Sequence, residues 1–114
     1  MIALVDCENV RRSLWPNLSP ERLLELLARW AESQGVEVVA VFDGAAPEAI
    51  AGVDVVGTGP ESADDRIAAR AAELQEPYLL VTSDRELRER AGRGAEQVIG
   101  GGSFARTLQA EADA

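Results

Sequence analysis

Short apolar segments alternate with amphipathic segments along the whole chain, and this alternation constrains the fold more than any other feature. β-Branched apolar runs predict strands at 2–6, 36–44, 53–58, 78–83 and 96–100. Helical periodicity predicts helices at 19–35, 62–74, 84–92 and 103–112, and an alanine-rich stretch predicts a short helix at 45–51. Strands this apolar, separated by helices, are typical of a parallel sheet covered on both faces. We therefore predict a three-layer α/β/α fold with a parallel five-stranded sheet.

The length of the chain is that of one domain. With 114 residues, 46% of them hydrophobic, it can bury a single core. We predict one domain over 1–114, in which the tail at 106–114 is a helix that frays at its end. Neither a signal peptide nor a membrane span is recognisable, so we expect a cytoplasmic protein without a membrane partner.

The first long helix has clear signals at both ends. Ser19 is the predicted N-cap, Pro20 occupies the first helical position and Gly35 is the stop signal. These signals predict a helix that begins and ends within one or two residues of those positions.

Missing residue types exclude many kinds of active site. The chain has no histidine, and its eleven basic residues are all arginine. Histidine-based nucleases, zinc hydrolases and Ser-His-Asp triads are therefore excluded, as are enzymes that place a lysine beside a phosphate. The single cysteine, Cys7, fits a cysteine-phosphatase loop poorly, since four residues rather than five separate it from Arg12. The remaining chemistry is that of carboxylates.

Acidic residues follow the predicted strands. Asp6 and Asp43 close the first two strands, Asp84 follows the fourth, and Asp64 lies in the first turn of the helix after the third. With strand order 3-2-1-4-5, the carboxyl ends of strands one and four border a crevice at the same sheet edge. Hard cations such as Mg²⁺ or Mn²⁺ bind carboxylate oxygens together with water and phosphate. The pattern therefore favours a metal site at this edge.

Each acid also has a structural interpretation. "SADD" and "SDRE" resemble capping boxes that pair Ser62 with Asp65 and Ser83 with Glu86. Acids in a first turn, such as Asp64 and Asp84, are favoured by the helix dipole, and the "FDG" around Asp43 is also a common strand-to-turn ending. Asp6 has no evident capping role. Polar neighbours that would support a carboxylate site, or merely cap a turn, are Asn9, Thr82 and Ser83.

The net charge of −9 argues against indiscriminate nucleic-acid binding, but the arginines are clustered. Arg11, Arg12 and Arg85 lie near the predicted rim, where they would hold phosphates. The alternative is that most arginines are solvated and paired, as Arg90 would be with Glu86. Trp15 follows the first strand and either stacks on an unpaired base or packs against its own domain.

Five short motifs in order resemble the NYN domains of the PIN-like nuclease superfamily, especially the YacP-like bacterial branch. The family has a strand ending in D-x-x-N, a strand ending in F-D-G, an A-D that begins a helix, a strand running into T-S-D, and a late glycine before a short strand and a final phenylalanine-containing turn. The corresponding segments are "LVDCEN", "VFDG", "ESADDRIA", "LLVTSD" and "VIGGGSF", and together they cover roughly residues 2 to 105.

This resemblance implies a metal-dependent ribonuclease with strand order 3-2-1-4-5. It implies Asp6, Asp64 and Asp84 as catalytic metal ligands of Mg²⁺ or Mn²⁺, with Asp43 or Asp65 as auxiliary acids, and it implies supporting roles for Asn9 and Ser83. The predicted partner is RNA, in single-stranded form; a ribosome or protein partner stays an open question. Two alternatives also stay open: a catalytically inactive PIN-like domain that binds RNA or protein, and a small-molecule phosphohydrolase.

Overall fold

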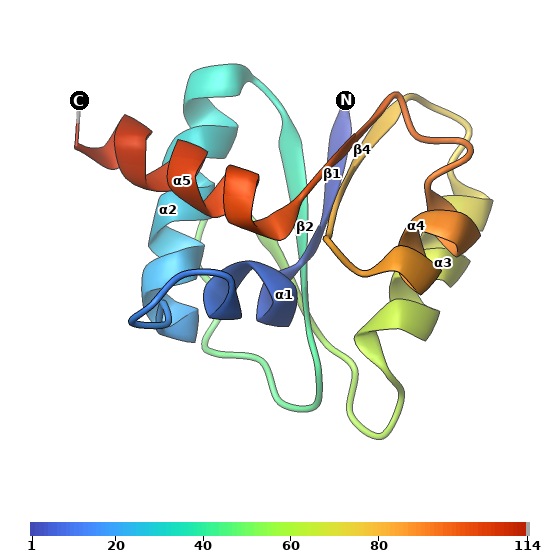
Figure 1. Ribbon diagram of the computed structural model, residues 1–114, viewed down its shortest axis with the longest axis horizontal. Helices are drawn as coiled ribbons and strands as arrows, with labels where there is room; N and C mark the ends of the chain where they lie inside the picture. The colour runs from blue at the N-terminus through green and yellow to red at the C-terminus, as the bar shows by residue number, and fades with distance from the viewer. Residues whose placement is uncertain (114) are drawn as a thin grey trace.

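The structure is a computed structural model that describes residues 1–113. Within these residues the chain forms a five-stranded sheet in which every neighbouring pair is parallel, with order β3-β2-β1-β4-β5. Figure 1 shows β1 between β2 and β4. The strands are β1 (Ile2–Asp6), β2 (Glu37–Phe42), β3 (Asp54–Gly57), β4 (Tyr78–Val81) and β5 (Gln97–Ile99). The predicted fold class and strand order are therefore confirmed.

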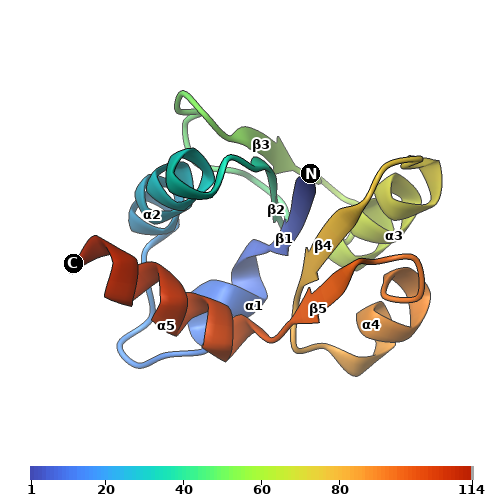
Figure 2. The ribbon, with the colours of Figure 1, turned by 90° about the horizontal axis from the view of Figure 1, so that it is seen from above.

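Helices cover both faces of this sheet. They are α1 (Cys7–Arg12), α2 (Pro20–Gln34), α3 (Ala63–Glu73), α4 (Arg85–Ala91) and α5 (Gly101–Ala112). Helices α1, α2 and α5 lie on one face, and α3 and α4 lie on the other (Figure 2). Trp30 of α2 and Phe104 of α5 meet edge to face, with ring centroids 4.9 Å apart, which ties two helices of one layer together.

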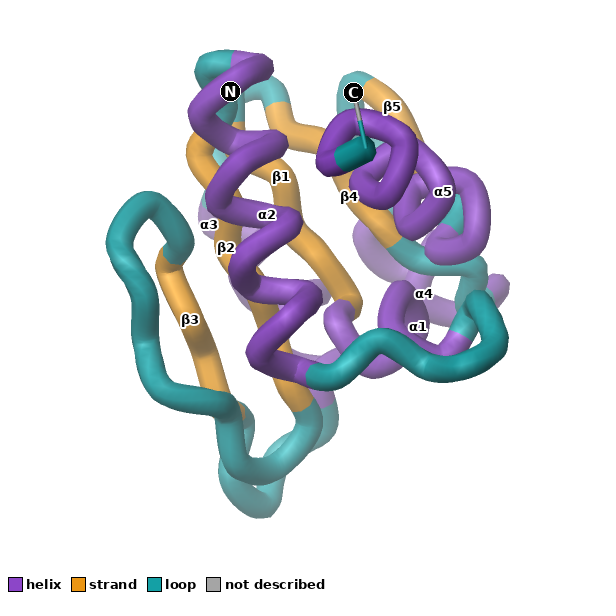
Figure 3. Tube along the Cα trace, turned by 90° about the vertical axis from the view of Figure 1, so that its left-hand side faces the viewer, coloured by secondary structure: helices purple, strands orange, loops and turns teal. Residues whose placement is uncertain are grey.

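The central strand β1 supplies side chains to both cores. Ala3 and Val5 belong to the core under α1, α2 and α5, whereas Ile2 and Leu4 belong to the core under α3 and α4. All four residues are buried, as expected for a strand in the middle of a sheet covered on both faces. In contrast to β1, the strand β3 lies at one edge of the sheet and is flanked by long loops (Figure 3).

The predicted signals at the ends of α2 are confirmed. Ser19 is the N-cap and its hydroxyl accepts a 3.1 Å hydrogen bond from the backbone N–H of Arg22. Pro20 is the first helical residue, where its missing N–H leaves no unpaired donor. Gly35 ends the helix with φ of 65°, a left-handed conformation that glycine adopts without a steric penalty.

One predicted helix is absent, and one observed helix was not predicted. The segment 45–51 is not helical, because it contains Pro47 and is bracketed by Gly44 and Gly52, both at positive φ. The six-residue helix α1 was missed because Asp6, its N-cap, makes no side-chain cap bond and because so short a helix has little local signal. It is held instead by burial of Cys7 and Val10, which fall on one face.

Helix α5 begins at Gly101 rather than at Ser103. Glycine is a poor helix former, which hides this start in the sequence. The predicted frayed tail at 106–114 includes seven helical residues of α5, and Ala114 lies outside the described residues. Within residues 1–113, no helix has the combined length and hydrophobicity needed to span a membrane.

Candidate active site

An open pocket of about 520 Å³ lies at the carboxyl edge of the sheet. Its walls come from the ends of β1 and β2, from α1, from the start of α3 and from the loop between β4 and α4. Four of the predicted acids, all from different segments, line this one pocket. The lining residues are Asp6, Glu8, Asn9, Arg12, Ser13, Asp43, Asp64, Ser83 and Asp84.

Asp6 is the most buried carboxylate of the pocket, with 5% of its surface exposed. The Thr82 hydroxyl donates a 2.9 Å hydrogen bond to its Oδ2. Burial raises the pKa of Asp6 to about 6; the hydrogen bond from Thr82 opposes this rise, and the nearby charges of Asp64 and Asp43 add to it. Thr82 is itself fully buried and contacts the pocket through this hydrogen bond; its supporting role stays a prediction.

Asp64 is the second residue of α3 and is half-buried. Its pKa is raised, first by burial and then by the charges of Asp84 and Asp43, while Arg90 acts in the opposite direction. The carboxylates of the pocket thus repel one another. A bound cation would relieve that repulsion.

Asp84 is the N-cap of α4. Its Oδ1 accepts a 2.9 Å hydrogen bond from the backbone N–H of Leu87, and its own N–H donates to Thr82 Oγ1 at 3.1 Å. The predicted capping box that begins at Ser83 was wrong, because the Ser83 hydroxyl accepts from the N–H of Gly101 at 2.8 Å instead. One oxygen, Thr82 Oγ1, therefore joins the segments that carry Asp6 and Asp84.

Asn9 links α1 to the loop that precedes α4 by a hydrogen bond. Its Oδ1 accepts a 2.9 Å hydrogen bond from the backbone N–H of Ser83, whose hydroxyl in turn receives the N–H of Gly101. A Cβ at Gly101 would overlap Asn9 Oδ1 and lie 3.2 Å from Asn9 Cγ. The sequence analysis gave Gly101 no role in the site, although the late-glycine motif "VIGGGSF" contains it.

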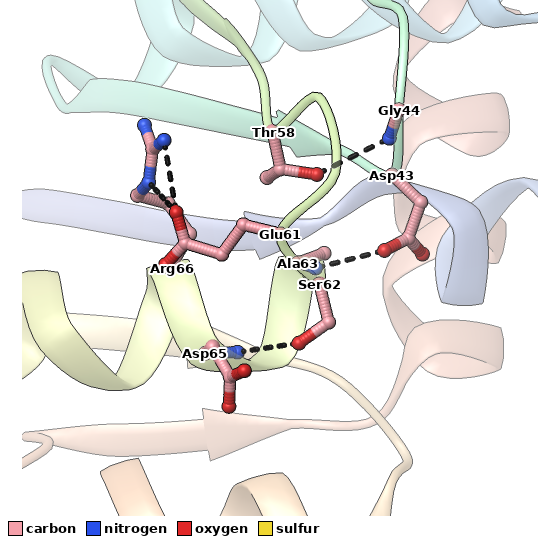
Figure 4. Close-up of polar contacts among 8 residues, drawn as sticks. All are labelled: Asp43, Gly44, Thr58, Glu61, Ser62, Ala63, Asp65 and Arg66. Atoms are coloured by element: carbon pink, nitrogen blue, oxygen red, sulfur yellow. Dashed lines mark hydrogen bonds and ion pairs between the residues drawn. The ribbon is translucent and has the colours of Figure 1, made fainter.

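The remaining two acids differ in their surroundings. Asp43 lines the pocket, and its Oδ1 accepts a 2.8 Å hydrogen bond from the backbone N–H of Ala63 (Figure 4). Asp65 is not among the pocket residues; it is exposed and forms a 2.9 Å ion pair with Arg90. The predicted ion pair of Arg90 with Glu86 is thus replaced by one between α3 and α4.

The basic and aromatic candidates surround the pocket unevenly. Glu8 forms ion pairs with Arg11 at 3.0 Å and with Arg12 at 3.1 Å. Arg12 is well exposed and lines the pocket, whereas the side chain of Arg11 is largely buried. Arg85 is exposed but is not part of the lining. Trp15 is 89% exposed, so the interpretation that it packs against its own domain was wrong.

The donor chemistry of the pocket fits a hard cation. In residues 1–113, no three acidic or cysteine side chains stand close enough together to hold a metal ion by themselves. Mg²⁺ commonly uses one or two carboxylates and keeps several waters, which an open pocket of this size accommodates. Cys7 is buried and burial raises the pKa of its thiol, so carboxylates are the available ligands. The predicted ligand set of Asp6, Asp64 and Asp84 stays a prediction.

Similarity to known proteins is visible at the level of structure. No protein-family model matches the sequence, and no curated protein matches it. Rae1 (YacP) from Bacillus subtilis, in its W164L mutant form, superimposes with a TM-score of 0.78 and 26% identity, over 98% of this chain and 77% of that chain. The chain has a YacP-like fold. Rae1 without that mutation matches with the same TM-score and 23% identity, over 99% of this chain and 76% of its own.

Proposed function

We propose that this protein is a metal-dependent ribonuclease that hydrolyses phosphodiester bonds of single-stranded RNA at the acidic pocket. The observation that carries the proposal is the convergence of four carboxylates, from four segments of a YacP-like fold, on one open pocket. The chain lacks histidine and lysine, so carboxylates and a cation would perform the chemistry.

In this proposal Asp6, Asp64 and Asp84 hold Mg²⁺ or Mn²⁺, one or two of them directly and the remainder through water, and Asp43 supports them. The cation would supply Lewis-acid activation of water and stabilisation of charge on the leaving oxygen. Thr82 orients Asp6 and the backbone of Asp84 through its hydroxyl. These buried contacts hold the carboxylates in place before substrate binds.

The rim of the pocket supplies the groups that would bind RNA. Arg12 lines the pocket and exposes its guanidinium to solvent, which suits a contact to a flanking phosphate. Arg11 is largely buried and paired with Glu8, so it is not assigned this role. Arg85 is exposed outside the pocket lining and would contact a phosphate farther along the RNA, and exposed Trp15 would stack on an unpaired base. RNA is therefore the proposed partner, bound in single-stranded form.

The test is cleavage of labelled single-stranded RNA by the purified protein with Mg²⁺, with Mn²⁺ and with EDTA, beside single-stranded DNA of the same sequence. Cleavage should require the cation and should be lost in Asp6→Asn and Asp64→Asn. Cleavage that persists in EDTA would refute the metal mechanism. Glu25→Gln, which neutralises an exposed carboxylate paired with Arg22 on α2 outside the pocket lining, is the control for loss of negative charge.

One observation favours a second function, that of a catalytically inactive domain that binds RNA or protein. The described residues contain no group of three side chains gathered closely enough to bind a metal unaided. If this second function holds, RNA binding persists without turnover, and Asp64→Asn leaves the affinity for RNA unchanged in EDTA and in Mn²⁺.

A further inference from the structure

Asp43 makes a contact that the proposed chemistry does not require. Its Oδ1 accepts the N–H of Ala63, the first residue of α3, at 2.8 Å (Figure 4). The first N–H groups of a helix have no partner within the helix, and a carboxylate near them is also favoured by the helix dipole. Ser62, the N-cap, accepts from the N–H of Asp65 at 3.1 Å. Two hydrogen bonds therefore hold the start of α3. One is made by its own N-cap, Ser62, and the other by Asp43 at the end of β2.

The backbone beside Asp43 is itself held to the loop between β3 and α3. The N–H of Gly44 donates to Thr58 Oγ1 at 3.1 Å, and the carbonyl of Gly44 accepts from Gly59 at 3.1 Å. The N–H of Thr58 donates to the carbonyl of Phe42 at 3.1 Å, and Thr58 is 4% exposed. Figure 4 shows the Gly44 and Ala63 bonds on either side of Asp43.

Close packing leaves this loop little freedom. A Cβ at Gly57 would lie 2.9 Å from the carbonyl oxygen of Gly44 and 2.9 Å from the N–H nitrogen of Ala46. Such contacts are shorter than real Cβ atoms make, so the two turns touch backbone to backbone. The direction in which Asp43 extends toward α3 is therefore constrained by the packing and hydrogen bonds of these two turns.

We propose that Asp43 is a positioning residue that acts through α3: by holding Ala63, it sets where the next residue, Asp64, stands in the pocket. The proposal rests on the proposed function, in which Asp64 is a catalytic carboxylate. It assigns Asp43 a hydrogen-bond role, for which an oxygen acceptor suffices and a negative charge is unnecessary.

Two substitutions separate this role from that of a metal ligand. Asp43→Asn keeps an amide oxygen that can accept from Ala63 but removes the charge, whereas Asp43→Ala removes both. If Asp43 positions α3, Asp43→Asn should keep cleavage within about threefold of wild type, and Asp43→Ala should lower kcat by about 10- to 100-fold with KM little changed, the scale expected of a misplaced catalytic group. If Asp43 is a metal ligand instead, Asp43→Asn and Asp43→Ala should lose RNA cleavage to the same extent.

Thr58→Val provides a variant that leaves every carboxylate intact. Valine has the shape of threonine but cannot accept from Gly44, so the turn that carries Asp43 should loosen. The kcat of Thr58→Val should therefore be lower than that of wild type, as for Asp43→Ala. The matched control is Glu61→Ala, which removes a carboxylate from the same loop; Glu61 pairs with Arg66 and lies outside the pocket lining, so cleavage should not change.

Amide hydrogen exchange in EDTA gives a readout that does not depend on activity. The Ala63 amide should be protected in wild type and in Asp43→Asn and should exchange at least about tenfold faster in Asp43→Ala. Equal loss of cleavage in Asp43→Asn and Asp43→Ala, or an Ala63 amide equally protected in wild type and Asp43→Ala, would overturn the positioning role. A wild-type protein that cleaves no RNA would refute the proposed function instead, and the exchange result would still decide whether Asp43 holds Ala63.

Discussion

Thr82 donates a 2.9 Å hydrogen bond to Oδ2 of Asp6, and 76 positions of sequence separate these two buried residues. The contact joins the ends of the neighbouring strands β1 and β4, where the strand order reverses direction. It also places a carboxylate with a raised pKa at the floor of the pocket.

The raised pKa of Asp6 predicts a pH-dependent stability in metal-free buffer. Its pKa is about 6 in the folded protein against an ordinary value of 3.8, because burial disfavours the charged form. The folded state therefore holds the proton more tightly, so the stabilisation is fully present below about pH 4 and is lost as the pH rises through about 6. Above that range ionised Asp6 should cost about 3 kcal/mol. Asp6→Asn should be more stable than wild type at about pH 8 and lose this advantage toward about pH 4.

The check on Asp6 is chemical denaturation of both proteins in EDTA across that range of pH. The difference in free energy of unfolding between wild type and Asp6→Asn isolates the one carboxyl group, since other titrating groups are shared. A difference that does not vary with pH would contradict the assigned shift.

Thr82→Val should destabilise the protein by about 2–4 kcal/mol, because valine fills the same space but leaves the N–H of Asp84 and the carboxyl group of Asp6 without their partner. Thermal unfolding in EDTA measures this loss. Thr107→Val is the matched control: its exposed hydroxyl donates to the carbonyl of Ser103, and its effect should stay within about 0.5 kcal/mol. A Thr82→Val protein as stable as the control would show that the buried bonds contribute little.

Asp84 has two roles that different substitutions separate. Asparagine caps helices as well as aspartate does, so Asp84→Asn should keep the bond to Leu87 and the stability in EDTA while abolishing cleavage. Asp84→Ala loses the cap and should cost about 1 kcal/mol in addition. Unfolding and RNA cleavage are measured on both variants. Full activity in Asp84→Asn would refute Asp84 as a catalytic metal ligand.

Gly101→Ala should displace Asn9 and weaken the link from α1 to Ser83, because the added methyl overlaps Asn9 Oδ1. We expect a loss of about 1–3 kcal/mol, the usual cost of overpacking. Gly102→Ala is the control one residue away, where the new Cβ would make an ordinary 3.5 Å contact with Arg106. That change should be neutral or stabilise by up to about 1 kcal/mol, since alanine is the better helix former. Equal melting temperatures for the two variants would contradict the overlap.

Arg12→Ala should weaken RNA binding and reduce the slope of log affinity against log salt by about 1, the change expected for one lost phosphate contact. Its effect on folding should remain below about 1 kcal/mol, because the ion pair with Glu8 is largely exposed on the Arg12 side. Fluorescence anisotropy with a labelled RNA at several salt concentrations gives the slope. An unchanged slope would leave Arg12 as a solvated charge paired with Glu8.

Much of the fold was predictable from local signals in the sequence. Apolar runs separated by helices required a parallel sheet covered on both faces, and right-handed crossovers permitted the observed strand order. Because the carboxyl ends of parallel strands share one edge, acids that follow strands had to gather there. Asp6, Asp43, Asp64 and Asp84 were found on these grounds, and all four line the pocket.

The contacts that organise the pocket could not be predicted, because they join residues that are far apart in sequence and depend on how each helix is rotated. Adjacent acids illustrate this: Asp64 faces the pocket while Asp65 pairs with Arg90, since successive residues of a helix point about 100° apart. Likewise Asn9 accepts a hydrogen bond from the N–H of Ser83, although 74 positions of sequence separate the two residues. Hydrophobic periodicity and turn residues act locally, so the strands and the helices α2 to α5 were predictable from the sequence, whereas α1 was not. The partners that hold each carboxylate emerged only from the packed fold, because burial and hydrogen bonding between distant segments do not exist before the chain folds.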